Sequence, residues 1–86
     1  MPRALSIKRS IVPLSERTKY LERLKTRKEH YKRAACEFWV FEEAALTGAF
    51  IEFVEAADAT TLEAAHAAAL EPVLDPARIY TEVELT

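Results

Sequence analysis

Hydrophobic and polar residues alternate in the first part of the chain, over residues 4–12. A period of two is typical of a β-strand that buries one face. The apolar side of this segment comprises Leu5, Ile7 and Ile11, and the polar side comprises Ser6, Lys8 and Ser10. We therefore predict a strand here and expect its apolar side to face the core.

The next segment has apolar residues at the three- and four-residue spacing of an amphipathic helix. Pro13 ends the first strand, and Ser15 is suited to cap a helix that runs to about residue 35. Its apolar positions are Tyr20, Leu21, Leu24 and Tyr31. Because Lys, Arg and Glu fill the remaining positions, we expect this helix to pack one side on the core and expose the other.

A second, shorter helix is predicted between Asp58 and Pro72. Asp58 and Thr60 are both candidate caps, and Thr60 with Glu63 has the spacing of a capping box. The apolar stripe of this helix comprises Leu62, Ala65, His66, Ala69 and Leu70. A neutral imidazole at His66 could act as a base, a hydrogen-bond donor or a haem ligand. The alternative is a structural histidine at the edge of the stripe, hydrogen-bonded or half solvated.

Two aromatic-rich segments, residues 36–43 and 49–55, flank the only glycine, Gly48, and indicate a β-hairpin. A proline-containing connector, 71–77, then leads to a last alternating segment, 78–85. Its two sides comprise Ile79, Val83 and Leu85, and Tyr80, Glu82 and Glu84. The predicted order of elements is therefore β-α-β-β-α-β.

This order predicts one α+β domain over residues 1–86, of the ferredoxin-like kind. In that arrangement both helices cover one face of a four-stranded antiparallel sheet. The alternation assigns to the other, open face the residues Ser6, Lys8, Ser10, Glu37, Trp39, Phe41, Phe50, Glu52, Val54, Tyr80 and Glu82. So many aromatic residues on one exposed face predict a homodimer that packs sheet on sheet, with Lys8 and Glu52 as a candidate ion pair within the interface.

Composition supports a packed globule, since half of the 86 residues are hydrophobic and 30% are charged. A single cysteine, Cys36, leaves no internal disulfide, and no Cys and His residues have the spacing of a zinc site. No apolar run is long enough for a secretion signal or a membrane span. We expect a cytoplasmic protein that does not associate with membranes.

Charge is distributed unevenly along the chain, with eleven Lys and Arg and three acidic residues in residues 1–35, and one and eleven in residues 36–86. A basic half can indicate a nucleic-acid surface. Glu16, Glu22 and Glu29 interrupt the basic helix, and folding brings the two halves together, so we do not expect nucleic-acid binding. One glycine also excludes a glycine-rich phosphate loop.

The order of elements resembles that of the dimeric α/β-barrel superfamily, and the chain is similar to its antibiotic biosynthesis monooxygenase family. The most specific likeness is the stretch Thr61-Leu-Glu-Ala-Ala-His-Ala-Ala-Ala-Leu70, which resembles that family's small and apolar residues around a helical histidine, here His66. The haem-degrading relatives add a strand-one asparagine and a tryptophan near the second helix. This chain has no asparagine, and its only tryptophan, Trp39, lies in the predicted second strand.

The resemblance implies a small dimeric oxygenase that uses no metal or bound cofactor and acts on an aromatic or polyketide-like molecule. Its pocket would lie between the helices and the sheet, where His66 would be the catalytic group. The alternative function is a non-catalytic dimeric scaffold, or a module that binds a small ligand or a protein. The shared fold does not choose between them.

Four other side chains are candidates for the pocket. Arg9 interrupts the apolar side of strand one, so we expect it to face the helices and to require a partner. The partner would be an anionic group of the substrate, which would place Arg9 beside His66, or an acidic side chain near a helix end, unless Arg9 reaches the sheet margin. The hydroxyls of Tyr20 and Tyr31 are expected to line the pocket, although both rings also suit a plain core. Trp39 could stack on a flat ligand or fill the dimer core.

Overall fold

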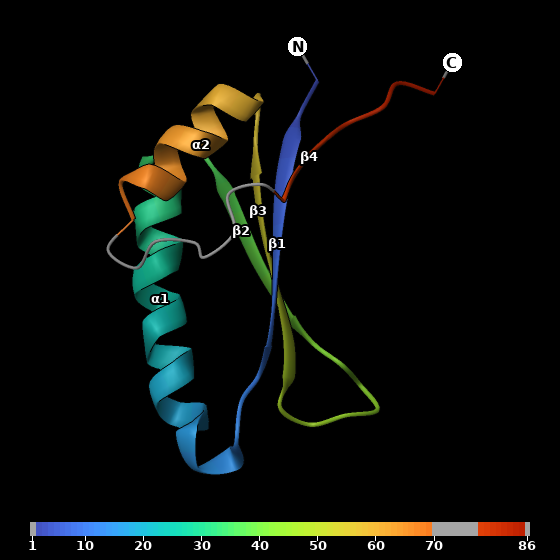
Figure 1. Ribbon diagram of the computed structural model, residues 1–86. Helices are drawn as coiled ribbons and strands as arrows, with labels where there is room; N and C mark the ends of the chain where they lie inside the picture. Colours follow the sequence, from blue (N-terminus) through green and yellow to red (C-terminus); the bar gives the residue numbers. More distant parts are fainter. Residues whose placement is uncertain (1, 70–77, 86) are drawn as a thin grey trace.

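The computed structural model describes residues 2–69 and 78–85. The elements are β1 (Ala4–Ile11), the short 3-10 helix η1 (Leu14–Glu16), α1 (Arg17–Arg33), β2 (Glu37–Glu42), β3 (Ala49–Ala56), α2 (Ala59–Ala67) and β4 (Ile79–Thr81). The strands form one antiparallel sheet in the order β2-β3-β1-β4, and both helices lie on the same side of it (Figure 1). This α+β architecture was predicted and is compatible with a ferredoxin-like fold.

Each helix ends or begins with a recognisable backbone signal. Asp58 caps α2, with its Oδ1 accepting a hydrogen bond of 2.7 Å from the N–H of Thr61. α1 ends at Arg33, and Ala35, two residues later, has a positive φ of 63°. There the N–H of Cys36 donates to the carbonyl of Tyr31 over 2.8 Å, as in a Schellman motif. These local signals fix where each helix meets the sheet.

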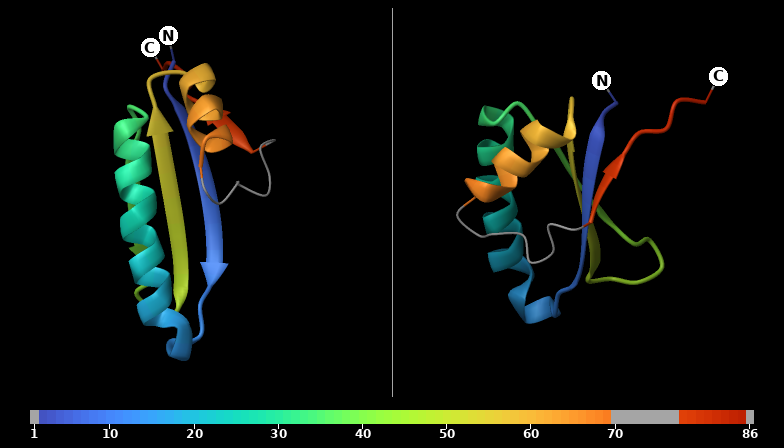
Figure 2. Two further views of the ribbon diagram at one scale, coloured as in Figure 1. Left: turned by 90° about the vertical axis from the view of Figure 1, so that its left-hand side faces the viewer. Right: turned by 45° about the horizontal axis from the view of Figure 1, so that its top comes forward.

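The hydrophobic core lies between the two helices and the sheet (Figure 2). α1 contributes Tyr20, Leu24 and Tyr31, and α2 contributes Leu62 and Ala65, all of them buried as predicted. The strands contribute the buried residues Ala4, Phe38, Phe50, Val54 and Ala56. The core is small, and two of its largest members are tyrosines, whose hydroxyls require polar partners.

The predicted faces of β1 and β3 are wrong, whereas those of β2 and β4 are correct. Phe50, Glu52 and Val54 are buried under the helices rather than placed on the open face. In β1 the small residues Ala4 and Ser6 are buried, because His66 of α2 occupies the space above them. The apolar side of β1 therefore lies on the open face.

The observed open face is more apolar than the predicted one, because the faces of β1 and β3 are reversed. Residues directly opposite each other on neighbouring strands share a face, which identifies its members. Its members are Leu5, Ile7, Arg9, Ile11, Glu37, Trp39, Phe41, Ala49, Ile51, Phe53, Glu55 and Tyr80. Lys8 and Glu52 are cross-strand partners, but on the helix side of the sheet, so the predicted ion pair is not in the open face.

β4 is much shorter than the predicted strand over residues 78–85. Glu82 still donates its N–H to the carbonyl of Arg3 over 2.8 Å, but the chain then leaves the sheet. Val83 and Leu85 are 74% and 93% exposed. The predicted connector 71–77 and Leu70 lie outside the described residues. No helix in the described part of the chain is long and apolar enough to cross a membrane.

Candidate functional site

Polar side chains meet in the middle of the layer between helices and sheet. They form two groups that we call the His66 cluster, comprising Ser6, Tyr31 and His66, and the Glu52 cluster, comprising Tyr20, Arg27 and Glu52. α1 supplies a member to both clusters, because residues seven and eleven positions apart return to one side of a helix. Six polar side chains in so small a core make this layer the leading candidate for a functional site.

His66 is held at both of its ring nitrogens. Nε2 lies 2.7 Å from the Ser6 hydroxyl oxygen, and Nδ1 lies 2.9 Å from the Tyr31 hydroxyl oxygen. The residue is 8% exposed, and its ring meets that of Tyr31 edge-on, with centroids 5.4 Å apart. Burial lowers the pKa of His66 from its usual value, and the charge of His30 lowers it further. The ring is therefore a neutral base at neutral pH.

Glu52 is the one acidic side chain buried among the described residues, at 4% exposure. Arg27 donates to its Oε1, and the hydroxyl of Tyr20 donates to its Oε2 over 3.0 Å. The guanidinium supplies the charge that a buried carboxylate requires. Burial raises the pKa of Tyr20, and the nearby negative charge of Glu52 raises it further. Tyr20 thus stays protonated and acts as a donor.

The two clusters also influence each other electrostatically. Burial is the main cause that raises the pKa of Tyr31, while the charge of Arg27 lowers it and that of Glu52 raises it. Among the described residues, no buried side-chain nitrogen or oxygen lacks a hydrogen-bond partner. The layer therefore holds a neutral imidazole, three hydroxyls and a compensated ion pair in one satisfied arrangement.

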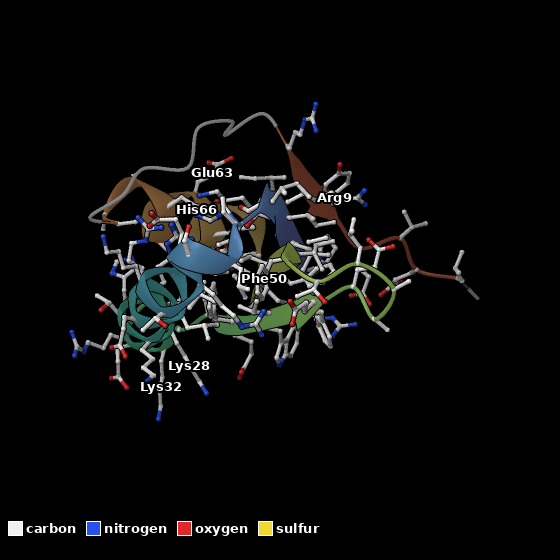
Figure 3. All side chains as sticks on the ribbon, turned by 90° about the horizontal axis from the view of Figure 1, so that it is seen from below. Arg9, Lys28, Lys32, Phe50, Glu63 and His66 are labelled. Atoms are coloured by element: carbon white, nitrogen blue, oxygen red, sulfur yellow. The ribbon has the colours of Figure 1, made fainter. Side chains whose placement is uncertain are left out.

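His66, Tyr20 and Tyr31 lie where the sequence predicted, but Arg9 does not. Figure 3 shows Arg9 on the side of the sheet away from His66, and Arg9 pairs across the strands with Ile51 of the open face. The expectation that Arg9 and His66 share a pocket is wrong, because it depended on the reversed face of β1. Trp39 lies on the open face as predicted and is 44% exposed, on the side of the sheet away from the His66 cluster.

Three members of the layer were missed from the sequence. Ser6 and Glu52 were assigned to the open face, and Arg27 was treated as part of a solvated basic side. One signal was available: Arg27 lies seven residues after Tyr20 and four before Tyr31, on the inner side of the same helix. An arginine at that position requires a buried acid, and Glu52 is the acid among apolar neighbours on β3.

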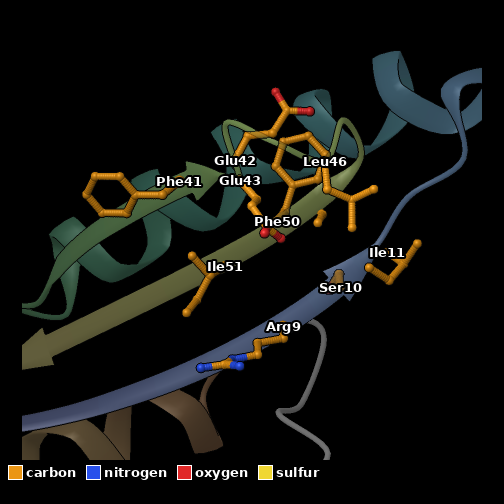
Figure 4. Close-up of a pocket in the computed structure, with 10 residues that line it drawn as sticks. Arg9, Ser10, Ile11, Phe41, Glu42, Glu43, Leu46, Phe50 and Ile51 are labelled. Carbon is orange, nitrogen blue, oxygen red and sulfur yellow. The ribbon is translucent and has the colours of Figure 1, made fainter.

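Arg9 borders a groove on the open face, with a volume of about 530 Å³ (Figure 4). Its apolar lining includes Ile11, Phe41, Leu46 and Ile51. Within the described part of the chain, the Arg9 guanidinium has no ion pair or hydrogen bond to a side chain. The groove therefore contains the Arg9 cation, without an ion pair, among apolar residues and the acidic side chain of Glu43.

Glu42 also lines the groove, but its charge is already matched. Arg17 donates to both of its oxygens, over 2.6 and 2.9 Å, and the N–H of Gly48 donates over 2.9 Å. The bonds from Arg17 and then from Gly48 lower the pKa of Glu42 to about 2. Gly48 has a φ of 94°, and a Cβ there would lie 2.6 Å from the Val12 carbonyl oxygen, so the turn requires glycine.

Residues 2–69 and 78–85 contain no group of three or more His, Cys, Asp and Glu side chains placed to hold a metal ion. Cys36 is a free, buried thiol, and burial raises its pKa. Comparison of the chain with protein-family models, with curated proteins and with solved structures finds no match. The geometry of the two clusters and of the open face is therefore the basis for a function.

Proposed function

We propose that the chain forms a homodimer in which two open sheet faces pack together, as in the dimeric α/β barrels that it resembles. The open face carries eight large apolar side chains, among them Trp39, Phe41 and Phe53. Phe41 and Phe53 already contact each other edge-on, with centroids 5.7 Å apart. A contiguous aromatic surface of this kind on so short a chain favours burial against a second copy, which also adds to a small core.

We further propose that the dimer is a cofactor-independent, monooxygenase-like enzyme whose site is the His66 cluster. The substrate would be a small aromatic or polyketide-like molecule with an acidic hydroxyl or C–H group. The neutral imidazole accepts the proton of that group through the hydroxyl of Tyr31 or Ser6, because both ring nitrogens are bonded to those hydroxyls. The resulting electron-rich substrate anion supplies all four electrons that reduce O₂, so that one oxygen atom enters the substrate as a quinone-type carbonyl and the other leaves as water.

The observation that carries this proposal is the environment of His66. Its ring is neutral, and each nitrogen is bonded to a hydroxyl through which a proton could pass. Titratable groups with perturbed pKa values that lie together in one layer are typical of sites that transfer protons. The Glu52 cluster would fix the orientation of α1 and so hold Tyr31 in place.

The two histidines of the chain allow a matched test, since His30 lies near the cluster but bonds the carbonyl of Ala65 instead. We would measure O₂ consumption with 1-naphthol and with a substituted hydroquinone, for the native chain and for His66→Phe and His30→Phe. The proposal predicts turnover that falls more than tenfold in His66→Phe and less than twofold in His30→Phe. If His66→Phe does not fold, Tyr31→Phe, which keeps the aromatic ring, replaces it in this test.

The imidazole NMR signals give a second readout that does not require turnover. Addition of either phenol should shift the His66 signals and leave those of His30 nearly unchanged. If no phenol shifts the His66 signals and none supports O₂ consumption, the enzyme proposal is contradicted.

A second candidate function is a dimeric scaffold without catalysis, and one observation favours it. Every buried polar side-chain atom in the described residues already has a partner within the protein. A catalytic layer commonly leaves a donor or acceptor for its substrate, whereas a purely structural one does not. If Tyr31→Phe loses stability while no phenol shifts the His66 signals, the clusters stabilise the fold and the scaffold is the better account.

A further inference from the structure

Two features project from the sheet toward the open side, at opposite ends of the molecule. The hairpin between β2 and β3 lies at one end, and the C-terminal tail, residues 82–85, lies at the other (Figures 1 and 2). The hairpin residues Glu43 and Leu46 form one wall of the groove, and Arg9 of β1 lies across from them (Figure 4). The open face is therefore bounded by a groove at one end and by an extended tail at the other.

The tail exposes side chains that a binding partner could cover. Val83 and Leu85 are among the most exposed large hydrophobic residues in the described chain, and Glu82 and Glu84 alternate with them. Glu82 is bonded to Arg3 through both oxygens. Glu84 has no ion pair or hydrogen bond among the described residues. The tail thus presents two aliphatic side chains and one uncompensated carboxylate.

The groove presents the complementary set. Its exposed apolar residues Ile11, Phe41 and Leu46 would accept aliphatic side chains, and Arg9 would accept a carboxylate. Glu42 does not compete for Arg9, because Arg17 and Gly48 already bind it. Glu43 also borders the groove, but from the hairpin side, opposite Arg9 (Figure 4).

The tail cannot reach the groove of its own chain. Arg3 and Arg9 are six residues apart on one strand, which corresponds to about 20 Å. Glu82 is hydrogen-bonded to Arg3, and Glu84 is only two residues farther, a reach of at most about 7 Å. The occupant of the groove must therefore come from another molecule.

We propose that the C-terminal tail of one copy binds in the groove of a second copy, with Glu84 paired to the partner subunit's Arg9. When two sheets face each other across a two-fold axis that crosses the strands, the tail end of one lies over the hairpin end of the other. The contact then occurs twice, as an isologous interface requires. This inference depends on the proposed homodimer and names the segment that closes it.

Charge reversal tests the pairing, with sedimentation velocity to measure the dimer dissociation constant. Arg9→Glu and Glu84→Arg should each weaken the dimer at least tenfold, and the double variant should return to within threefold of the native chain. Glu63→Arg is the control, because Glu63 is exposed on α2, on the helix side, and should change nothing.

Mixing the two single variants shows whether the contact joins different chains. A heterodimer of Arg9→Glu with Glu84→Arg contains two complementary pairs, so the mixture should associate as tightly as the native chain. Single variants that leave the dimer unchanged, or a mixture without recovery, would overturn the tail contact while the sheet-to-sheet dimer stands. A native chain that sediments as a monomer would overturn both.

Discussion

At the scale of single residues, His66 links the candidate chemistry to stability. Its pKa is lowered in the folded protein, mainly by burial, from an unfolded value near 6.5. As the pH falls below about 6.5, the unfolded chain binds this proton before the folded one does. The stability that neutral His66 provides is therefore fully present above that pH and decreases as the pH falls toward the folded pKa.

Urea unfolding at pH 7.5 and pH 5.5 measures this dependence. The native chain should be less stable at the lower pH, and NMR titration should show His66 protonating below 6.5. In His66→Phe the part of the pH dependence that arises from this ring should vanish, whereas His30→Phe should retain it. A His66 that titrates above 6.5 would mean that the ring is not desolvated as described.

Glu52 is the residue with the largest expected effect on folding. Its replacement by alanine leaves Arg27, whose side chain is 18% exposed, and the hydroxyl of Tyr20 without their carboxylate. Loss of one partner of a buried ion pair commonly costs about 3 kcal/mol. Glu29→Ala is the matched control, since its contact with Arg33 is exposed and should contribute about 0 to 1 kcal/mol.

Equilibrium urea denaturation of the two variants gives both free energies of unfolding. If Glu52→Ala were no more destabilised than Glu29→Ala, the Glu52 cluster would not be a stabilising part of the layer.

At the scale of elements, the end of α1 contains a strained residue. Ala35 adopts a positive φ, which costs an L-residue about 1 to 2 kcal/mol, and it is exposed. Glycine has no such cost but loses more entropy on folding. Ala35→Gly should therefore stabilise the protein by about 0.5 to 1 kcal/mol.

Ala45→Gly is the control for this change, because Ala45 is also exposed but has no positive φ. It should destabilise the protein by up to about 1 kcal/mol. Thermal melts of both variants should shift in opposite directions, and a downward shift for Ala35→Gly would refute the strain.

The strands explain which part of the fold could be predicted from the sequence. Element order and most helix positions followed from periodicity, since Tyr20, Leu24 and Tyr31 are buried on the inner side of α1. Leu21, which was predicted among them, is exposed, because it lies on the solvent side of the helix. β3 alternates Phe50, Glu52 and Val54 with Ile51, Phe53 and Glu55, so both of its sides mix apolar and acidic residues and periodicity cannot orient it.

β1 was oriented wrongly for a different reason. Its more apolar side faces away from the helices, against the rule that the apolar side of a strand faces the core of its own chain. The prediction of the site was affected by these errors. The positions of His66 and both tyrosines were predicted, but Ser6 and Glu52 were missed because the faces of β1 and β3 were assigned wrongly. For the same reason, Arg9 was wrongly predicted to lie beside His66.

At the scale of the whole molecule, the face of β1 is itself informative. A chain that places Leu5, Ile7 and Ile11 on an uncovered sheet face, while small and polar residues fill its own interior, has an apolar surface to bury elsewhere. The proposed homodimer would bury this apolar surface, because two such faces together form a second core. The polar layer would then lie within each subunit, and the apolar face would lie between the two subunits.

The molar mass in solution tests the proposed homodimer most directly. Light scattering on a sizing column would be run over a range of protein concentrations for the native chain, Trp39→Lys and Leu21→Lys. Trp39 lies on the open face, and Leu21 is a comparably exposed apolar residue on the solvent side of α1. A dimer through the open face predicts twice the chain mass for the native protein and Leu21→Lys, and a single chain mass for Trp39→Lys. A native protein with the mass of one chain at every concentration would contradict it.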